Sequence, residues 1–355
     1  MTYRVVQWST GNVGRHAIAG IDARPDLELV GVWVSNPDKV GVDAGTLAGL
    51  DRELGVAATD DAAALLALRP DCIVHTAWAD TRLFEAMADL ERFLRAGIDV
   101  VSSSPVFLQH PWGAVGEDMY RGVVAAAEEG GASLWVNGVD PGFANDWLPL
   151  VMTSVCERID EVRCMEILNY ATYDQPDVLF DIMGFGQSLD EVPFILSPGI
   201  LTTAWGSVVA QLAAGLDLTL DEIVEWHERV PAPEAFDVAS GRIEAGTTAG
   251  MRFEVRGVVG GETKVVVEHV TRLRDDLAPE WPQPTGHGGY RVVITGEPTY
   301  TVDMQMVGGD GDHNTAGLKA TAMRLVNAVA AVVAAPPGLL SALDLPLVTG
   351  RGLVS

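Results

Sequence analysis

The sequence predicts an α/β protein. It begins with a Rossmann domain, a doubly wound parallel sheet with helices on both faces, and continues into an α+β domain with an antiparallel sheet. Two observations support this fold class. Short apolar strands alternate with helical segments over residues 1–146, which is typical of a parallel sheet. Longer strand-like runs then follow one another within residues 147–314, which favours antiparallel pairing.

Local signals predict each element of the first domain. Pro25 and Pro70 end two helical segments, and Gly97 lies just past the end of a third. Strands are expected in the segments YRVVQW, LELVGVWV, DCIVHTA, IDVVSSS and SLWVNGV. Helices are expected in GNVGRHAIAGIDARP, TDDAAALLALRP, TRLFEAMADLERFLRAG and EDMYRGVVAAAEEGG.

The second domain, residues 147–314, is expected to combine long strands with one amphipathic helix. Strands are expected in RIDEVRCMEILNY, GMRFEVRGVVGG, TKVVVEHVTRLR and YRVVITGEPTYTVDMQM, with a hairpin at VGGET. TLDEIVEWHERV is expected to be an amphipathic helix capped by Thr219, with Glu222 three residues on. Residues 315–355 are expected to form a C-terminal helix and tail. The sequence allows this helix to pack on the first domain but does not establish it. Its segment LVNAVAAVVAAPPGLL is too short to span a bilayer and reads as a buried helix.

Composition narrows the partners and the location. The chain has 355 residues, of which 49 are acidic and 23 basic, giving a formal net charge of -26. Nucleic acids and anionic membranes attract basic surfaces, so neither is expected as a partner. The three cysteines form no CxxC pattern, and the N-terminal MTYRVVQW lacks the features of a signal peptide. A reduced, cytoplasmic setting is therefore expected.

The segment VVQWSTGNVGRHAIAG predicts a dinucleotide phosphate loop. Gly11 allows a pyrophosphate to approach the backbone, and Gly14 allows the helix to pack closely on the strand. Ser9 replaces the first glycine of the G-x-G-x-x-G pattern, and the alternative is a purely structural turn. The predicted cofactor contacts of this loop are Ser9, Thr10, Gly11, Asn12, Val13 and Gly14.

The end of the second strand favours NADP over NAD. An Asp or Glu there would bind the ribose hydroxyls of NAD. Ser35, Asn36 and Lys39 instead offer uncharged donors and a lysine, which suit a 2′-phosphate. Asp38 weighs against this interpretation, so NAD stays possible.

Loops after the later strands supply further candidate cofactor contacts. NGVDPGFANDW leaves the last Rossmann strand at the domain junction, where ligands of such sheets bind, although a structural hinge is the alternative. The candidates are Thr76, Ala77, Ser102, Ser103, Asn137, Pro141, Gly142 and Phe143. The seven histidines form no short-range metal motif, and no hydrolase or kinase motif is present, so no metal is predicted.

Four motifs together resemble one superfamily. QWSTGNVGR, SNPDKVGVDAG, NGVDPGF and APPGLLSALDLPLVTGRG are similar to the dihydrodipicolinate-reductase-like superfamily, most of all to the branch of 2,4-diaminopentanoate dehydrogenase and the native amine dehydrogenases. The resemblance covers essentially the whole chain. It implies the two-domain architecture above and a homodimer, with residues 147–314 closing over the nicotinamide as the substrate domain and supplying the dimer interface. It also implies hydride transfer from NAD(P)H to a C=N bond formed from a ketone and ammonia.

The chain departs from that family in its acid–base residues. Amine dehydrogenases of the branch carry a Glu in the loop after the fifth Rossmann strand, and here Val106 or Phe107 falls at that position of SSPVFLQHPW. The His-His pair and lysine of true dihydrodipicolinate reductases are also missing. Tyr170, Tyr173 and His110 are the candidate proton donors, and each also has a purely structural interpretation.

Three functional hypotheses follow. The first is an NAD(P)H-dependent reductase acting on a C=O or C=N carbon of a small substrate, which Phe143, Trp147 and Phe180 suggest is mainly apolar. The second is a true amine dehydrogenase that aminates ketones or aldehydes with a non-standard acid–base residue, for which Glu166 is the first candidate. The third is a non-catalytic NADP-binding sensor.

Overall fold

The computed structural model describes residues 2–79 and 82–354, and the chain divides into two compact units. Unit 1 comprises Met1–Pro111, Gly116–Val139 and Leu318–Ser355, and unit 2 comprises Trp112–Val115 and Asp140–Gly317. The main divisions thus fall after residues 139 and 317, whereas the sequence places the domain boundaries after residues 146 and 314. The expected outer domain limits, Met1 and Ser355, and the expected helix start at Thr81 lie outside the described residues.

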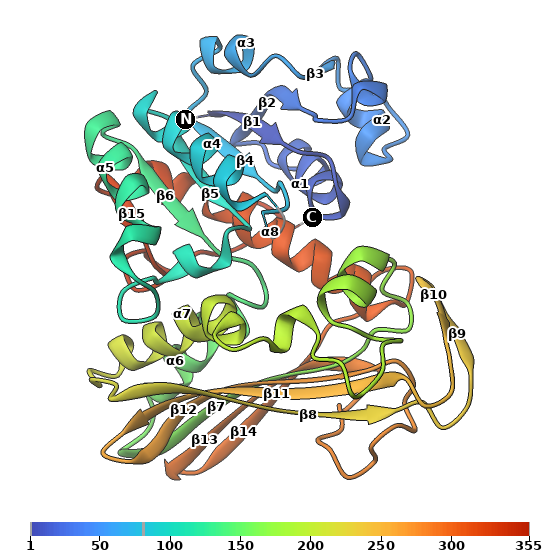
Figure 1. Cartoon of the computed structure of the whole chain (residues 1–355). Helices are drawn as coiled ribbons and strands as arrows, with labels where there is room; N and C mark the ends of the chain where they lie inside the picture. Colours follow the sequence, from blue (N-terminus) through green and yellow to red (C-terminus); the bar gives the residue numbers. More distant parts are fainter. Residues whose placement is uncertain (1, 80–81, 355) are drawn as a thin grey trace. The chain divides into compact units, whose positions relative to one another are not determined.

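Unit 1 contains a parallel sheet with the strand order β15-β6-β5-β4-β1-β2-β3 (Figure 1). The order reverses between β1 and β4, as in a doubly wound fold, and the predicted Rossmann fold class is confirmed. The strands are β1 (Tyr3–Trp8), β2 (Leu27–Trp33), β3 (Ala58–Thr59), β4 (Cys72–His75), β5 (Asp99–Ser102), β6 (Ser133–Val136) and β15 (Gly338–Leu340). The helices are α1 (Asn12–Asp22), α2 (Ala44–Ala48), α3 (Ala62–Ala67), α4 (Leu83–Arg95) and α5 (Arg121–Gly130).

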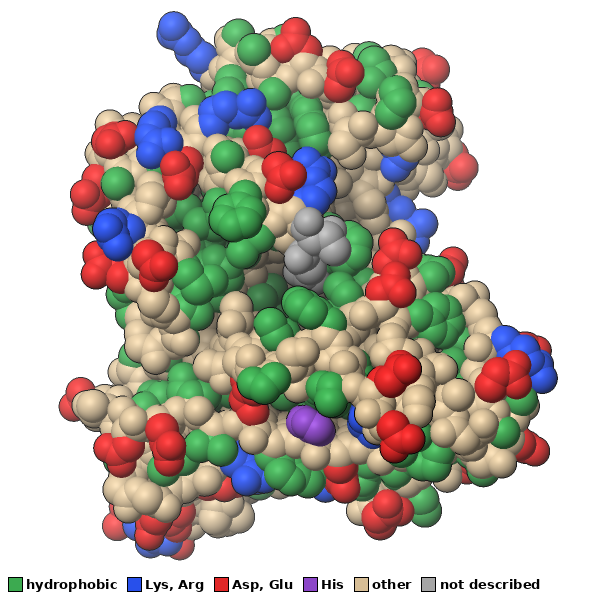
Figure 2. Space-filling model, in the orientation of Figure 1, with side chains coloured by type: hydrophobic (Ala, Val, Ile, Leu, Met, Phe, Trp, Pro, Cys, Tyr) green, Lys and Arg blue, Asp and Glu red, His purple; other side chains and the backbone are tan. Residues whose placement is uncertain are grey.

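The long helix α8 (His313–Val333) buries its apolar side chains in unit 1. Leu325, Val326 and Val329 pack with Val5 of β1 and Ile21 of α1. By length and composition alone this helix could cross a membrane. Its burial against the sheet instead matches the core helix of a globular domain. On the face of the molecule shown in Figure 2, acidic side chains are spread over the surface.

Unit 2 is built on a six-stranded sheet with the order β14-β13-β7-β12-β11-β8. The antiparallel pairings expected from the sequence are present, but β7 and β12 run parallel, so the sheet is mixed. The strands are β7 (Arg158–Asn169), β8 (Glu222–Pro231), β11 (Thr248–Val259), β12 (Glu262–Arg272), β13 (Gly288–Glu297) and β14 (Tyr300–Gln305). A separate pair, β9 (Phe236–Val238) and β10 (Gly241–Ile243), and the helices α6 (Trp147–Thr153) and α7 (Ile200–Gly215) complete the unit.

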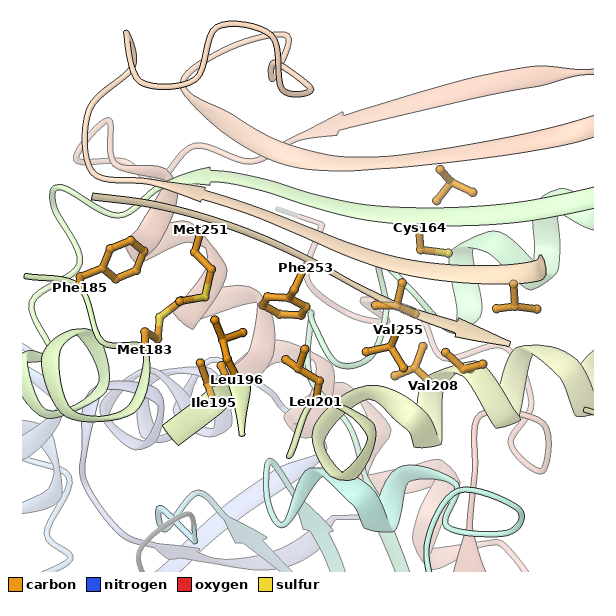
Figure 3. Close-up of a cluster of buried hydrophobic side chains, with 14 of the residues drawn as sticks. Cys164, Met183, Phe185, Ile195, Leu196, Leu201, Val208, Met251, Phe253 and Val255 are labelled. Atoms are coloured by element: carbon orange, nitrogen blue, oxygen red, sulfur yellow. The ribbon is translucent and has the colours of Figure 1, made fainter. Parts of the chain in front are cut away.

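One face of this sheet forms the apolar core of unit 2 under α7. Figure 3 shows Leu201 and Val208 of the helix opposite Phe253 and Val255 of β11, with Cys164 of β7 nearby. These side chains are at most 1% exposed. The core fixes which residues of β7, β11 and β12 point towards the helix.

The expected helix TLDEIVEWHERV is wrong, because this segment forms the strand β8. Ile223, Val224, Trp226 and Val230 are β-branched or aromatic and favour a pleated, half-buried surface. Ten residue pairs join β8 to the neighbouring β11. Long-range pairing therefore outweighs the local amphipathic pattern and the capping signal at Thr219.

Candidate active site

The β1–α1 turn of unit 1 has the features of an anion-binding loop. Helix α1 begins after Gly11, with no side chain capping its start and no acidic residue in its first turn. The first N–H groups of the helix are therefore available to an anion. Ser9 has a left-handed φ of 79°, the conformation that a glycine would adopt without strain.

Close packing and a lysine both define this loop. A Cβ atom on Gly14 would overlap the Ser9 carbonyl and lie 2.8 Å from Thr76 Oγ1, whereas Gly11 has open space where its side chain would be. The Lys39 ammonium donates to both the carbonyl and the hydroxyl of Thr10, at 3.1 Å each. The loop thus presents open backbone, a helix start and a cation to a phosphate.

The structure brings most of the predicted cofactor residues of unit 1 to one edge of the sheet. Asn12 and Val13 open α1, Ser35 and Asn36 follow β2, Thr76 and Ala77 follow β4, and Ser102 and Ser103 lie at the end of β5. These strands are neighbours and parallel, so their carboxyl ends meet at the same edge. The Asn36 side-chain oxygen already accepts a hydrogen bond from the Asp38 N–H at 2.9 Å, which leaves the amide NH2 group to contact a cofactor.

The predicted residues after β6 do not all belong to this edge. Asn137 lies in unit 1, is 2% exposed and accepts a hydrogen bond from Arg324 at 3.0 Å, which is a structural contact. Pro141, Gly142 and Phe143 belong to unit 2. There Phe143 stacks on Trp147 with ring centroids 5.7 Å apart.

The loop after β5 has no ionised group at neutral pH. Phe107 is 3% exposed and Val106 is half-buried, so the family position for a carboxylate carries apolar side chains. His110 is buried as well, and burial lowers its pKa to about 4, although the Asp344 carboxylate partly opposes this. A neutral imidazole of that kind is a poor proton donor near pH 7. His110 belongs to unit 1, whereas Tyr170 and Tyr173 belong to unit 2.

The two predicted tyrosines stack on each other at the end of β7. Their ring centroids are 4.7 Å apart with 26° between the planes. The Tyr170 hydroxyl donates to Glu166 Oε1 at 3.0 Å. Burial, followed by the Glu166 charge, raises the pKa of Tyr170 well above its usual value. Tyr170 therefore keeps its proton and acts on Glu166 as a hydrogen-bond donor.

Glu166 belongs to a buried cluster with Asp140 and His269. The parallel register of β7 and β12 places His269 beside Glu166, and their Nδ1 and Oε1 atoms are 3.5 Å apart. On its other side, His269 Nε2 lies 3.3 Å from Asp140 Oδ1. The same Asp140 oxygen accepts hydrogen bonds from Asn145 at 2.7 Å and from Trp205 at 3.1 Å. The side chains of all three cluster members are at most 6% exposed.

The cluster holds a cationic imidazole between two acids. Burial alone would lower the pKa of His269, but the Asp140 and Glu166 carboxylates outweigh it and raise the pKa to about 10. His269 is therefore an imidazolium at neutral pH. Burial, then Glu166 and Asp140, also raise the pKa of Tyr290, which faces Glu166 from β13.

The three side chains are also close enough to share a metal ion, because ligand atoms of Asp140, Glu166 and His269 lie within 4.8 Å of one another. Each ring nitrogen of His269 already faces one carboxylate, however, Nδ1 towards Glu166 and Nε2 towards Asp140, so the three side chains need no ion to offset their charges. The arrangement fits an ion-paired acid–base cluster better than a metal centre.

Sequence reasoning missed Asp140 and His269 as functional residues and named Glu166 only as a fallback. Asp140 lies within NGVDPGF, in which the sequence predicts cofactor contacts at Asn137, Pro141, Gly142 and Phe143 but not at Asp140. His269 interrupts the valine-rich strand TKVVVEHVTRLR. A histidine in so apolar a strand signals a buried polar group that needs a partner, but the partner is not evident from sequence.

Comparisons with known proteins agree with this architecture. The chain is 46% identical to an amine dehydrogenase of Streptomyces virginiae over 347 residues, 96% of each chain. Residues 143–352 match the family described as the 2,4-diaminopentanoate dehydrogenase C-terminal domain. The chain belongs to the amine dehydrogenase branch of the dihydrodipicolinate-reductase-like superfamily.

A more distant relative agrees with this membership, and a solved structure confirms the fold. A 2,4-diaminopentanoate dehydrogenase of Acetoanaerobium sticklandii is 24% identical, with 70% of this chain and 67% of that relative aligned. The solved structure of an amine dehydrogenase from Mycobacterium smegmatis superposes with a TM-score of 0.77 at 24% identity, over 99% of this chain and 98% of that one. The protein is thus an NAD(P)-dependent oxidoreductase of the amine dehydrogenase type.

A nicotinamide dinucleotide fits the β1–α1 loop of this amine dehydrogenase family member. Substituting Gly14 by alanine is expected to weaken NAD(P)H binding at least tenfold, because the new methyl group overlaps the Ser9 carbonyl and displaces the loop. Nicotinamide fluorescence titration measures the affinity, and thermal unfolding checks the fold.

Gly11→Ala is the matched variant for this test. It has room for its methyl group in the free protein, so the fold should be unaffected and binding should fall only if a phosphate passes close to this residue. A folded Gly14→Ala protein with unchanged affinity would disprove the assignment of the loop.

Proposed function

We propose that this enzyme is a working amine dehydrogenase, which combines a small, mainly apolar ketone or aldehyde with ammonia and reduces the resulting C=N bond with NADPH. The observation that carries the proposal is the Glu166 carboxylate, buried in unit 2 and contacted by Tyr170 and His269. It supplies the acid–base group that the loop after β5 lacks.

Glu166 completes the proton balance without an external acid. The carboxylate takes one proton from ammonium, and the freed ammonia adds to the carbonyl carbon. One proton of the added nitrogen then moves to the former carbonyl oxygen, which becomes a hydroxyl. The protonated Glu166 then returns its proton to the departing hydroxyl, which leaves as water and yields the iminium carbon. The bound dinucleotide supplies the hydride. Ketone, ammonium and NADPH thus give amine, water and NADP+, and Glu166 ends ionised as it began.

Tyr170 assists this chemistry by orienting Glu166. Because its pKa is raised, it stays protonated over the pH range of catalysis. Its hydrogen bond fixes one carboxylate oxygen. The ring of Tyr173 stacks on the ring of Tyr170 and restricts its movement.

A second function, ammonia-independent reduction of a carbonyl or preformed imine, is favoured by one observation. Val106 and Phe107 replace the carboxylate that the family uses to handle ammonia. In that case the enzyme would reduce ketones at the same rate with and without ammonium salts.

Glu166→Gln tests the proposal. The amide has the same shape but cannot take up a proton, so ammonia-dependent kcat should fall about 10²–10⁴-fold while NADPH affinity stays unchanged. Glu161→Gln is the matched control, because it lies on the same strand and pairs with Arg163 instead. Steady-state rates over a ketone panel with and without ammonium are the measurement. Ammonia-dependent turnover that survives in a folded Glu166→Gln enzyme excludes Glu166 as the base.

The preference for NADP is also part of the proposal. Lys39 lies at the phosphate loop, and Ser35 and Asn36 offer no carboxylate to a ribose hydroxyl. Lys39→Ala and Ser35→Asp should each lower the ratio of NADPH to NADH affinity about tenfold. The first removes a cation from the phosphate, and the second adds a carboxylate that repels the phosphate and binds the ribose hydroxyls of NADH instead. Lys264→Ala, which removes a lysine paired with Glu262, is the charge control. If both variants keep the wild-type ratio, the 2′-phosphate assignment is wrong.

The homodimer is proposed through the sheet of unit 2. The face opposite the α7 core carries a network in which Glu254 and Glu268, at most 4% exposed, pair with Arg163, Arg252 and Arg256. Because these charges are already paired within the chain, the broad strand surface can meet the same surface of a second copy without leaving a charge uncompensated. Multi-angle light scattering at micromolar concentration should give twice the mass of the 37.7 kDa chain, and a monomer would exclude this proposal.

A further inference from the structure

We propose that His269 is a positioning residue that binds Asp140 and Glu166 into one acid–base unit and acts on the substrate only through Glu166. This inference rests on the proposed function, in which Glu166 exchanges protons with ammonium and water. Nothing in the family resemblance assigns His269 a role.

The first support is the placement of the imidazole. Each ring nitrogen faces a different carboxylate, Nδ1 towards Glu166 and Nε2 towards Asp140. Nε2 is buried and has no hydrogen bond of good geometry, so its 3.3 Å contact with Asp140 is an ion-pair contact. One cation therefore lies between two acids that come from different parts of the chain.

The second support is the aromatic enclosure that fixes the ring. Phe253 stacks on His269 with centroids 4.7 Å apart and 13° between the planes. Trp205 meets the ring edge-on at 4.5 Å and also donates to Asp140. The imidazole cannot turn away from either carboxylate without displacing one of these rings.

The third support is the charge on this face of the sheet. In addition to its own members, the titratable groups described close to the cluster include Tyr170, Tyr173, Tyr290, Asp146 and Cys164. Arg163, Arg252 and Arg256, on the strands around His269, bind Glu254 and Glu268 on the opposite face. Arg229 of β8 binds the Leu189 carbonyl at 2.7 Å, and α7 carries no charged residue. Among these described groups, His269 is the cation that balances Asp140 and Glu166.

Loss of this cation would leave two buried carboxylates facing each other across the site. Two neighbouring carboxylates without a cation repel each other, and one of them takes up a proton at higher pH than it otherwise would. Because the pKa of His269 is raised to about 10, its charge persists through the working pH range. His269 is therefore a fixed charge, and the proton that moves belongs to Glu166.

His269→Gln removes the charge and keeps a polar side chain of similar reach. We expect kcat for ammonia-dependent turnover to fall at least tenfold and the acid limb of its pH profile to move upward by at least one pH unit. The KM for ketone and the affinity for NADPH should change less than about threefold. His227→Gln, an exposed position in the same row on β8, is the matched control and should keep the wild-type profile.

The double variant Asp140→Asn with His269→Gln covers the case in which the single variant fails to fold. It removes one acid together with the cation, so the cluster keeps the net charge that it has in the wild-type protein. The acid limb should therefore return towards the wild-type position. A folded His269→Gln enzyme with an unchanged pH profile overturns the inference, as does a double variant whose acid limb lies as high as that of the single variant.

The outcome is distinct from failure of the proposed function. If Glu166→Gln retains ammonia-dependent turnover, the proposed function fails whatever His269 does. If Glu166→Gln abolishes turnover and His269→Gln leaves both kcat and the pH profile intact, only the positioning role is excluded.

Discussion

The alternation of side chains along β-strands is the constraint on which the chemistry of unit 2 depends. Successive residues of a strand face opposite sides of the sheet. Glu166 and His269 therefore face the α7 core, while their neighbours Met165 and Glu268 face the other side. The parallel pairing of β7 with β12 puts Glu166 directly beside His269, and a shift of one residue would send one of them to the opposite face.

Burial makes this juxtaposition costly and therefore specific. Removing one partner from a buried ion pair costs about 3–5 kcal/mol, because the remaining charge is left without compensation. Here both carboxylates also accept hydrogen bonds: Asp140 accepts from Asn145 and Trp205, and Glu166 accepts from Tyr170. The donors come from a loop, a helix and a strand end. The cluster is thus fixed by packing of the whole unit, as a preorganised acid–base site must be.

Local chemistry explains what could be predicted from the sequence and what could not. The glycines at 11 and 14, the proline stops and the apolar strands act over a few residues, and they predict the Rossmann fold and its phosphate loop. Glu166 and His269 are separated by 103 positions and meet through the sheet register. Asp140 lies 26 positions before Glu166 and reaches His269 from the loop between β6 and α6. The same long-range pairing makes β8 a strand, although its sequence also satisfies a helical pattern.

Under the proposed function, a strand carboxylate takes the acid–base role that the family resemblance assigns to a loop carboxylate. A loop residue is positioned by few contacts and is easily replaced, as Val106 and Phe107 show. A carboxylate on a central strand is held by hydrogen-bonded neighbours on both sides, β12 and β13 in the case of Glu166. Its position then tolerates less movement, and its ionisation can be set by a second buried group such as His269. In that case, a strand carboxylate moves less than a loop carboxylate would, and a neighbouring buried charge can influence its ionisation.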